Sequence, residues 1–308
     1  MPDLGSNLNR IFLEHLQDPD LKKQAEERSM AFLKQRIYED SFMEKILPSR
    51  PISPSQCDRT ESSSGSPSML RKIIDKEYID VTATAMDFRG KGDFRYVETD
   101  TYAVDFFKIE SPEFTITEGE LRAKEQPIQA LLKHHTSRHI DEVIDRTFIA
   151  ACEAAIAASG QNIPAQADPT ILPKNLTKLR NLIDGRDGRR PLRAATLLMT
   201  QAQFNTVFTW PQSAIDNGLK DDFWKDGYRY DMLAGLRIVT TNKTHLLANN
   251  RVLLFTAPEF LGHHFTFNDD RFQIRTEWDT ISWKAWKTHG AAIGNNFAVA
   301  GMTLTGSL

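Results

Sequence analysis

The sequence predicts an α+β fold, in which helices and strands occupy separate stretches of the chain. Three observations support this class. Residues 1–47 carry apolar side chains at helical spacing, residues 79–109 alternate between apolar and polar side chains as strands do, and residues 128–159 show a second, longer helical pattern. At 308 residues, the chain is long enough for about two domains.

Residues 1–47 predict an N-terminal helical arm. One short helix follows Ser6, and a second runs from Asp18-Pro19-Asp20 to about Leu47. Residues 48–68 are rich in Pro and Ser and predict an extended linker. The linker and the end of the arm together form the segment 48–77. Such a linker offers no core, so we expect the arm to be covered by another chain or by its own body, and a chain lacking residues 1–68 to stay folded. The apolar positions of the second helix include Leu21, Ala25, Leu33, Ile37, Met43 and Ile46.

Residues 78–110 predict a long β-hairpin, whose tip is the Gly-rich turn at residues 89–93 with Lys91 at its centre. A two-stranded ribbon is marginally stable alone in water. The second strand carries large side chains that are costly to expose in a row: Phe94, Tyr96, Tyr102 and Phe106. We therefore expect either a helix beneath this hairpin or another chain to cover it.

A long helix is predicted next, ahead of a mixed α/β region. Thr117 to Glu120 suits a helix start, Pro127 marks a break or a first turn, and Gly160 ends the pattern. About 30 residues at 1.5 Å each make a rod of roughly 45 Å. Shorter elements follow: a helix at 175–184, a strand at 194–199, a helix capped by Thr200, and strands at 236–240, 251–255, 265–267, 272–286 and 297–304.

Composition narrows the possible functions. The chain has 38 Lys and Arg against 41 Asp and Glu, a net charge of −3, which argues against a protein that binds nucleic acid through a broadly basic surface. Its two cysteines, Cys57 and Cys152, are too few for a disulfide framework and favour a reducing compartment. Neither a signal peptide nor an apolar run of about 20 residues is visible, so we expect no membrane span.

Candidate chemical motifs are weak. His135, His139 and Glu142 share one helix face at i, i+4 and i+7, but Thr136 stands where a metalloprotease has its glutamate, which favours a solvated surface. The neighbouring His263 and His264 fall in a predicted strand and point to opposite faces. We therefore predict no catalytic residue, no cofactor and no metal.

The loop at residues 184–190 lacks the carboxylates of a calcium site and is interpreted as a flexible turn. Its arginines, Arg186, Arg189 and Arg190, are candidates for contact with an anion or an acidic neighbour.

In its order of elements the chain resembles the major capsid proteins of tailed bacteriophages, which share the Hong Kong-type phage capsid fold. The resemblance covers about residues 70–304: Ile79 to Ile109 match the extended loop, and about Gln126 to Ser159 match the spine helix. It implies an arm at 1–47, a linker at 48–77, an extended loop at 78–110, a peripheral domain with the spine at 111–163, an axial domain at 164–249, and closing strands of both domains at 250–308.

The resemblance implies a structural protein, not an enzyme, that assembles into hexamers and pentamers of an icosahedral virion head around double-stranded DNA. Its partners would be further copies of itself, a scaffolding protein and a portal protein, with room for a decoration protein, and assembly would take place in the host cytoplasm. The assembly residues expected on this view are Lys91, Phe94, Tyr96, Tyr102, Phe106, Leu21, Leu33, Ile37, Arg186, Arg189 and Arg190.

Two alternatives stay open. An encapsulin-like nanocompartment shell has the same fold and packages enzyme cargo instead of a genome. A metal-dependent enzyme would use His135, His139 and Glu142.

Overall fold

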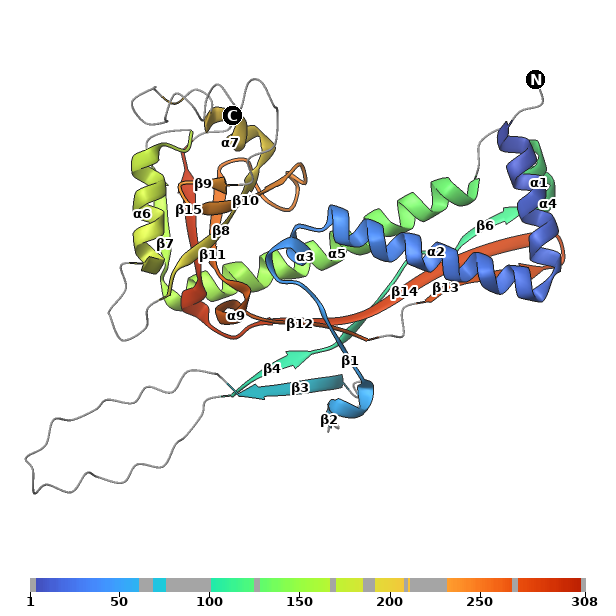
Figure 1. Ribbon diagram of the computed structural model, residues 1–308, viewed down its shortest axis with the longest axis horizontal. Helices are drawn as coiled ribbons and strands as arrows, with labels where there is room; N and C mark the ends of the chain where they lie inside the picture. The colour runs from blue at the N-terminus through green and yellow to red at the C-terminus, as the bar shows by residue number, and fades with distance from the viewer. Residues whose placement is uncertain are drawn as a thin grey trace, which may run out of the picture.

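The computed structural model describes residues 4–60, 69–75, 101–124, 128–166, 170–184, 192–207, 210, 232–267 and 271–305. Helix α5 (Ile128–Ser159) runs along much of an elongated molecule, with one sheet at one of its ends and a second sheet below and beyond it (Figure 1). Of the helices within these residues, none combines the length and hydropathy needed to cross a bilayer.

Helix α5 has 32 residues, so its length is about 48 Å. Gly160 takes a φ of +70° directly after the last residue, which is the left-handed geometry of a helix C-terminus. The long helix predicted from the sequence is thus confirmed. Its buried side includes an unbroken i, i+4 series: Ile140, Ile144, Phe148, Cys152 and Ile156.

A six-stranded sheet packs beside the C-terminal part of α5, in the order β7-β15-β11-β8-β10-β9. Along β8, Leu198 joins the core that contains α5, whereas Leu197 and Met199 join the core against α6 (Pro173–Asp184). The sheet is therefore covered on both faces. Its strands are β7 (Asn162–Gln166), β8 (Ala194–Thr200), β9 (Met232–Leu233), β10 (Leu236–Thr241), β11 (Arg251–Thr256) and β15 (Val299–Leu304). Thr200 caps α7 (Gln201–Thr206) as predicted.

The second six-stranded sheet is built on β14 (Thr280–Ile293), a strand long enough to pair with four others. Beyond one of these, β12, the short strand β1 forms an edge. The strands around β14 are β1 (Arg50–Ile52), β5 (Phe107–Glu110), β6 (Phe114–Thr117), β12 (Gly262–Phe267) and β13 (Arg271–Glu277). Three short helical segments accompany the sheets: α4 (Glu118–Ala123), α9 (Pro258–Leu261) and η4 (Asn296–Ala298). The predicted start of α4 is confirmed, since Thr117 and Glu120 form a capping box.

The arm comprises α1 (Leu4–Gln17), α2 (Pro19–Asp40) and α3 (Phe42–Ile46) and lies on its own subunit, with α2 across α5 and β13 (Figure 1). Of the two covers expected for the arm, the structure shows the subunit's own body. The second helix does not continue to Leu47, because Ser41 ends it and caps α3. Leu21 is half-buried; Leu33 and Ile37 belong to α2, but their side chains lie outside the described set.

The expectation of an unstructured linker at residues 48–68 was wrong in part. Strand β1 pairs in parallel with β12, and β2 (Asp58–Thr60) pairs with β3 (Met69–Asp75) after the short helix η1 (Pro54–Gln56). Pro51 is tolerated in β1 because an edge strand does not need every N–H group. This segment has few apolar residues, yet the hydrogen bonds of its backbone add one strand to each of two sheets.

A strand pair is observed at this place, but its first strand lies ahead of the predicted hairpin, which was expected to begin at residue 78. Strands β3 and β4 (Thr101–Asp105) pair in antiparallel register, with Asp75 opposite Thr101. Together with β2 they form a three-stranded sheet that projects from the body (Figure 1). The part predicted to form the tip, with Lys91, Phe94 and Tyr96, lies outside the described residues.

Candidate assembly surfaces

The ribbon, whose base is formed by β3 and β4, packs on its own subunit where the chain leaves β4, while Ile73 on β3 stays 51% exposed. Phe106 is 6% exposed and stacks on Phe267 with 4.5 Å between ring centroids. Tyr102 Oη and His263 Nδ1 are hydrogen-bonded at 2.5 Å. The expected cover for Phe106 and Tyr102 was a helix or another chain, and the structure corrects this: a sheet of the same subunit contacts both. The physical reason is that β5, which follows β4 directly, pairs with β14, and the sheet built on β14 supplies aromatic partners within the same subunit.

Two glycines allow this close approach. A Cβ atom on Gly290 would lie 2.7 Å from the carbonyl oxygen of Asp105, and one on Gly294 would lie 2.6 Å from the ring of Tyr102. Both distances are shorter than any side chain could accept without a shift of its neighbours. The absence of side chains at these two positions fixes where the ribbon leaves the body.

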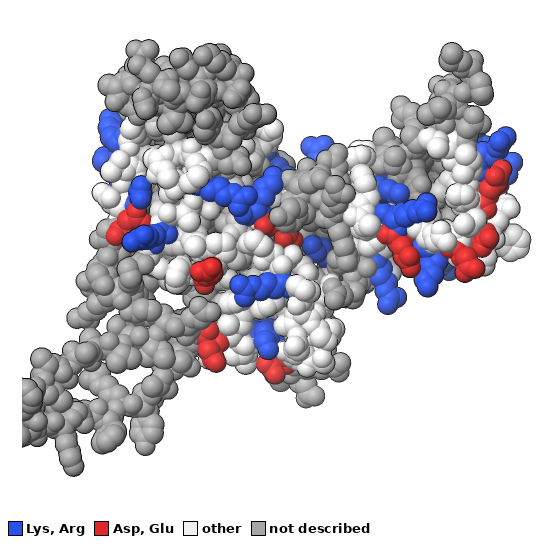
Figure 2. Space-filling model, in the orientation of Figure 1, with Lys and Arg blue, Asp and Glu red and all other residues white. Residues whose placement is uncertain are grey.

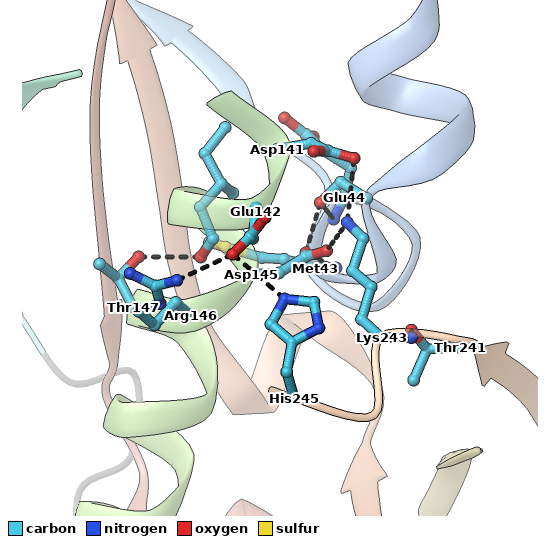
Figure 3. A network of polar contacts seen from close by, with 12 residues as sticks. Met43, Glu44, Asp141, Glu142, Asp145, Arg146, Thr147, Thr241, Lys243 and His245 are labelled. Carbon is cyan, nitrogen blue, oxygen red and sulfur yellow. Dashed lines mark hydrogen bonds and ion pairs between the residues drawn. The ribbon is translucent and has the colours of Figure 1, made fainter. Parts of the chain in front are cut away.

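The arm is anchored at α3 by a buried carboxylate (Figure 3). Asp145 on α5 is fully buried, and its Oδ1 accepts hydrogen bonds from Ser41 Oγ at 2.7 Å and from the backbone N–H of Met43 at 3.1 Å. The Ser41 hydroxyl in turn accepts from the N–H of Glu44, which caps α3. One carboxylate on the spine helix therefore sets the position of this turn of the arm.

Lys243, in the loop after β10, balances the charge of Asp145. Its Nζ lies 2.6 Å from Asp145 Oδ2 and 2.9 Å from Asp141 Oδ2. Burial raises the pKa of Asp145, an effect that Lys243 only partly offsets. Burial alone would lower the pKa of Lys243, but the two carboxylates outweigh it and raise that pKa. Loss of either carboxylate would leave the ammonium group in a half-buried site with less compensation.

Glu44 of α3 belongs to a second buried polar cluster. Its other members, His264, Lys287 and His289, come from the sheet built on β14. Glu44 Oε1 accepts from Lys287 Nζ at 3.5 Å, and its Oε2 lies 3.8 Å from His264 Nδ1. His264 and His289 face each other edge to face at 5.5 Å. Burial lowers the pKa of His264 to about 4 and the pKa of His289 well below its ordinary value, so both rings are neutral near pH 7.

Sequence reasoning placed His263 and His264 on opposite faces of a strand, and the structure confirms this. The sequence patterns did not predict the cluster around His264, because Glu44, His264 and His289 are far apart in the chain. The local signal was the spacing of Ser41 and Glu44, three residues apart, which is typical of a helix N-terminus but does not indicate a buried cluster.

The three candidate metal ligands do not converge. His135 and His139 are exposed, while Glu142 accepts from Arg146 at 2.8 Å and from His245 at 3.1 Å (Figure 3). Burial alone would raise the pKa of Glu142, but His245, Arg146 and, more weakly, the nearby His139 lower it. Within the described ranges, no group of three or more His, Cys, Asp or Glu side chains could hold a metal ion.

Surface charge is mixed. On the face drawn in Figure 2, Lys and Arg side chains are interspersed with Asp and Glu over the described part of the molecule. Arg186, Arg189 and Arg190 lie outside the described residues.

Comparison with known proteins identifies the fold. No protein-family model and no curated protein sequence matches the chain. Among solved structures, a chain of Microbacterium phage Oxtober96 matches with a TM-score of 0.61 and 11% identity, over 86% of this chain and 91% of that chain. The capsid structure of the cyanophage P-SCSP1u matches with a TM-score of 0.58 and 12% identity, over 88% of each chain. A virus-like particle from Pyrococcus furiosus matches with a TM-score of 0.50 and 13% identity, over 90% of this chain and 98% of that chain. The phage capsid fold predicted from the sequence is therefore confirmed.

Proposed function

We propose that this chain is a structural shell protein, which assembles into the hexamers and pentamers of an icosahedral virion head around double-stranded DNA. The observation that carries the proposal is the extent of the structural match. The fold of phage capsid structures accounts for most of this chain and for most of theirs. Assembly is then the activity, and no catalytic role is proposed.

The shape of the subunit supports this proposal. The ribbon projects from the body, and Ile73 on β3 is 51% exposed there (Figure 1). A small projecting sheet with exposed apolar side chains gains stability when a neighbour covers it. On this view Lys91, Phe94 and Tyr96 lie over the adjacent subunit of the same capsomer. The axial domain at 164–249 and the peripheral segments on either side of it in sequence are proposed divisions of the same subunit.

Charge supports a shell that surrounds DNA without binding it tightly. The net charge is −3, and acidic side chains are interspersed with basic ones (Figure 2). Tight binding to DNA depends on many Lys and Arg contacts to phosphates. The arginines at 186, 189 and 190 are the proposed site of any local contact with an anion or an acidic neighbour. Scaffolding, portal and decoration proteins are proposed partners of the assembly.

An encapsulin-like compartment is the second candidate, because the match to the virus-like particle from Pyrococcus furiosus spans 98% of that chain. The two candidate shells differ in what they enclose. Nuclease-resistant DNA inside particles isolated from the natural source supports a virion, whereas a co-purifying enzyme with no nucleic acid supports a compartment.

Purified protein tests the proposal at its simplest level. Sedimentation velocity and negative-stain microscopy should show rings, sheets or closed shells of uniform diameter. A chain that stays monomeric over a wide range of concentration, salt and crowding agents, with scaffolding protein added, would contradict a shell function.

A further inference from the structure

A groove in the arm is lined by apolar side chains and carries positive charge at its edge. It lies between α1, α2 and α5 and has a volume of about 390 Å³, within the roughly 300–1,000 Å³ range of pockets that hold small organic groups. Its apolar lining includes Leu8, Ile11, Phe12, Ala25 and Phe32. Leu8 and Ile11 are exposed there, although each would be more stable under cover.

Two cations line the same groove, Arg28 on α2 and Lys133 on α5. Burial and the charge of Arg28 lower the pKa of Lys133. Within the described part of the chain, neither cation has an ion-pair partner. The groove therefore combines an apolar lining with two cationic side chains.

The turn between β13 and β14 has complementary properties. Trp278 is fully exposed, and its backbone φ of +53° is in the left-handed region that a bulky residue rarely adopts. The residues on either side of it, Glu277 and Asp279, are acidic and exposed. A large aromatic side chain held outward by a strained turn is costly unless something covers it.

Both features lie at the same end of the elongated subunit (Figure 1). The backbone N–H of Glu118, at the start of α4, donates to the carbonyl oxygen of Asp279 at 2.6 Å. Asn9 on α1 donates to the carbonyl oxygens of Leu121 and Lys124 at the other end of α4. Helix α4 thus fixes the turn relative to the wall of the groove, yet Trp278 does not fill the groove of its own subunit.

We propose that Trp278 of one copy of this chain inserts into the α1–α2–α5 groove of a second copy. The indole would cover Leu8 and Ile11, and the acidic residues beside it would meet Arg28 and Lys133. Such a contact joins two different surfaces, so it repeats from copy to copy and closes into a ring where the geometry allows. The proposal rests on the proposed shell function and assigns to it a specific contact between subunits.

Fluorescence tests the burial of Trp278 directly. The chain has 5 tryptophans, so the emission of Trp278 is obtained as the difference between the wild type and Trp278→Phe, which keeps an aromatic side chain. In unassembled subunits this difference spectrum should show a solvated, readily quenched indole. In assembled particles it should shift to the blue and resist quenching by acrylamide. A spectrum that stays solvated in assembled particles overturns the contact and leaves the shell function standing.

Two sets of variants test where the indole goes. Trp278→Ala should weaken each contact by about thirtyfold or more, as the loss of a central interface tryptophan does, without changing the melting temperature of the subunit. Phe260→Ala, at an exposed aromatic residue on α9, is the matched control and should assemble normally. Equal assembly of both variants contradicts the proposal.

The charge reversals Asp279→Arg and Arg28→Asp should each impair assembly, and the two together should restore it. If the pair restores nothing while Trp278 is buried, the indole docks on some other surface and the assignment of the groove is wrong. If wild-type protein never assembles, the shell function and this contact fail together.

Discussion

The arm and the ribbon both extend from the central body, but they are held in different ways. The arm is held by apolar packing and by buried charged groups, with Phe42, Met43 and Ile46 at 1% exposure or less. The ribbon is held at its base by β-pairing and by close contact over Gly290 and Gly294, while Ile73 on β3 stays half exposed. The difference indicates that the arm contributes to the folding of the subunit, whereas the ribbon, under the proposed function, contributes to assembly.

Removal of residues 1–47 should have the largest effect and unfold the subunit. The truncation deletes four apolar side chains of 3% exposure or less, Phe42, Met43, Ile46 and Leu47. Their burial contributes about 6–12 kcal/mol, which approaches the whole stability of an ordinary domain at roughly 5–15 kcal/mol. The sequence alone led to the opposite expectation, that a chain without residues 1–68 keeps a folded body, and the same experiment decides between the two. Circular dichroism and near-ultraviolet spectra of the truncated chain provide the check, and a native-like spectrum would show that the arm is dispensable for folding.

Asp145→Ala should cost about 3–5 kcal/mol of unfolding free energy, because it leaves Lys243 undercompensated and removes the acceptor for Ser41 and Met43. Glu142→Ala is the matched control on the same helix. Its ion pairs lie nearer the solvent and should contribute less than about 1 kcal/mol. Urea denaturation of unassembled protein measures both. Equal losses would mean that the anchor of α3 is no stronger than a surface ion pair.

The His264 cluster should make the subunit less stable in acid. The pKa of His264 is about 4 in the folded chain and about 6.5 when unfolded, so below pH 6.5 the unfolded chain binds a proton that the folded chain does not. Its contribution is complete above pH 6.5 and is lost as the pH falls towards 4, by roughly 3 kcal/mol at most. The groups that face the ring are Glu44, Lys287, His289 and the carbonyl of Leu47.

Unfolding free energies measured at about pH 7.5 and pH 5 check this prediction. His264→Gln should reduce the difference between the two values, whereas the exposed His135→Gln should leave it as in the wild type. An unchanged difference in His264→Gln would show that the acid sensitivity arises elsewhere.

Ribbon variants should have the smallest effect on stability and a strong effect on assembly. Phe94→Asp combined with Tyr96→Asp should leave circular dichroism and melting temperature unchanged but abolish capsomers and shells. The exchange Phe94→Tyr with Tyr96→Phe keeps the aromatic surface and should assemble normally. Regular particles from the double Asp variant would place these two residues within their own subunit.

Sequence patterns predicted the elements whose signals are local. The stripe from Ile140 to Ile156, the cap at Thr117 and the helix end at Gly160 depend on residues a few positions apart, and all three were confirmed. Strand β1 was missed because its pairing with β12 spans more than 200 residues and uses only backbone groups.

The contacts of the candidate assembly residues could not be predicted for the same reason. The sequence showed that Tyr102 and Phe106 are too large to leave exposed, but their partners, His263 and Phe267, come from a strand more than 150 residues away. The size and apolar character of an aromatic side chain indicate that it is buried. The surface that buries it is determined by the tertiary fold.

An electron cryomicroscopy reconstruction of the assembled protein tests the central claim most directly. The account predicts closed shells in which each ribbon lies over an adjacent subunit while each arm stays on its own α5. Particles in which the arm crosses to a neighbour and the ribbon folds back on its own body would contradict the distinction between the two regions. A preparation that forms no particles under any assembly condition would contradict the shell function itself.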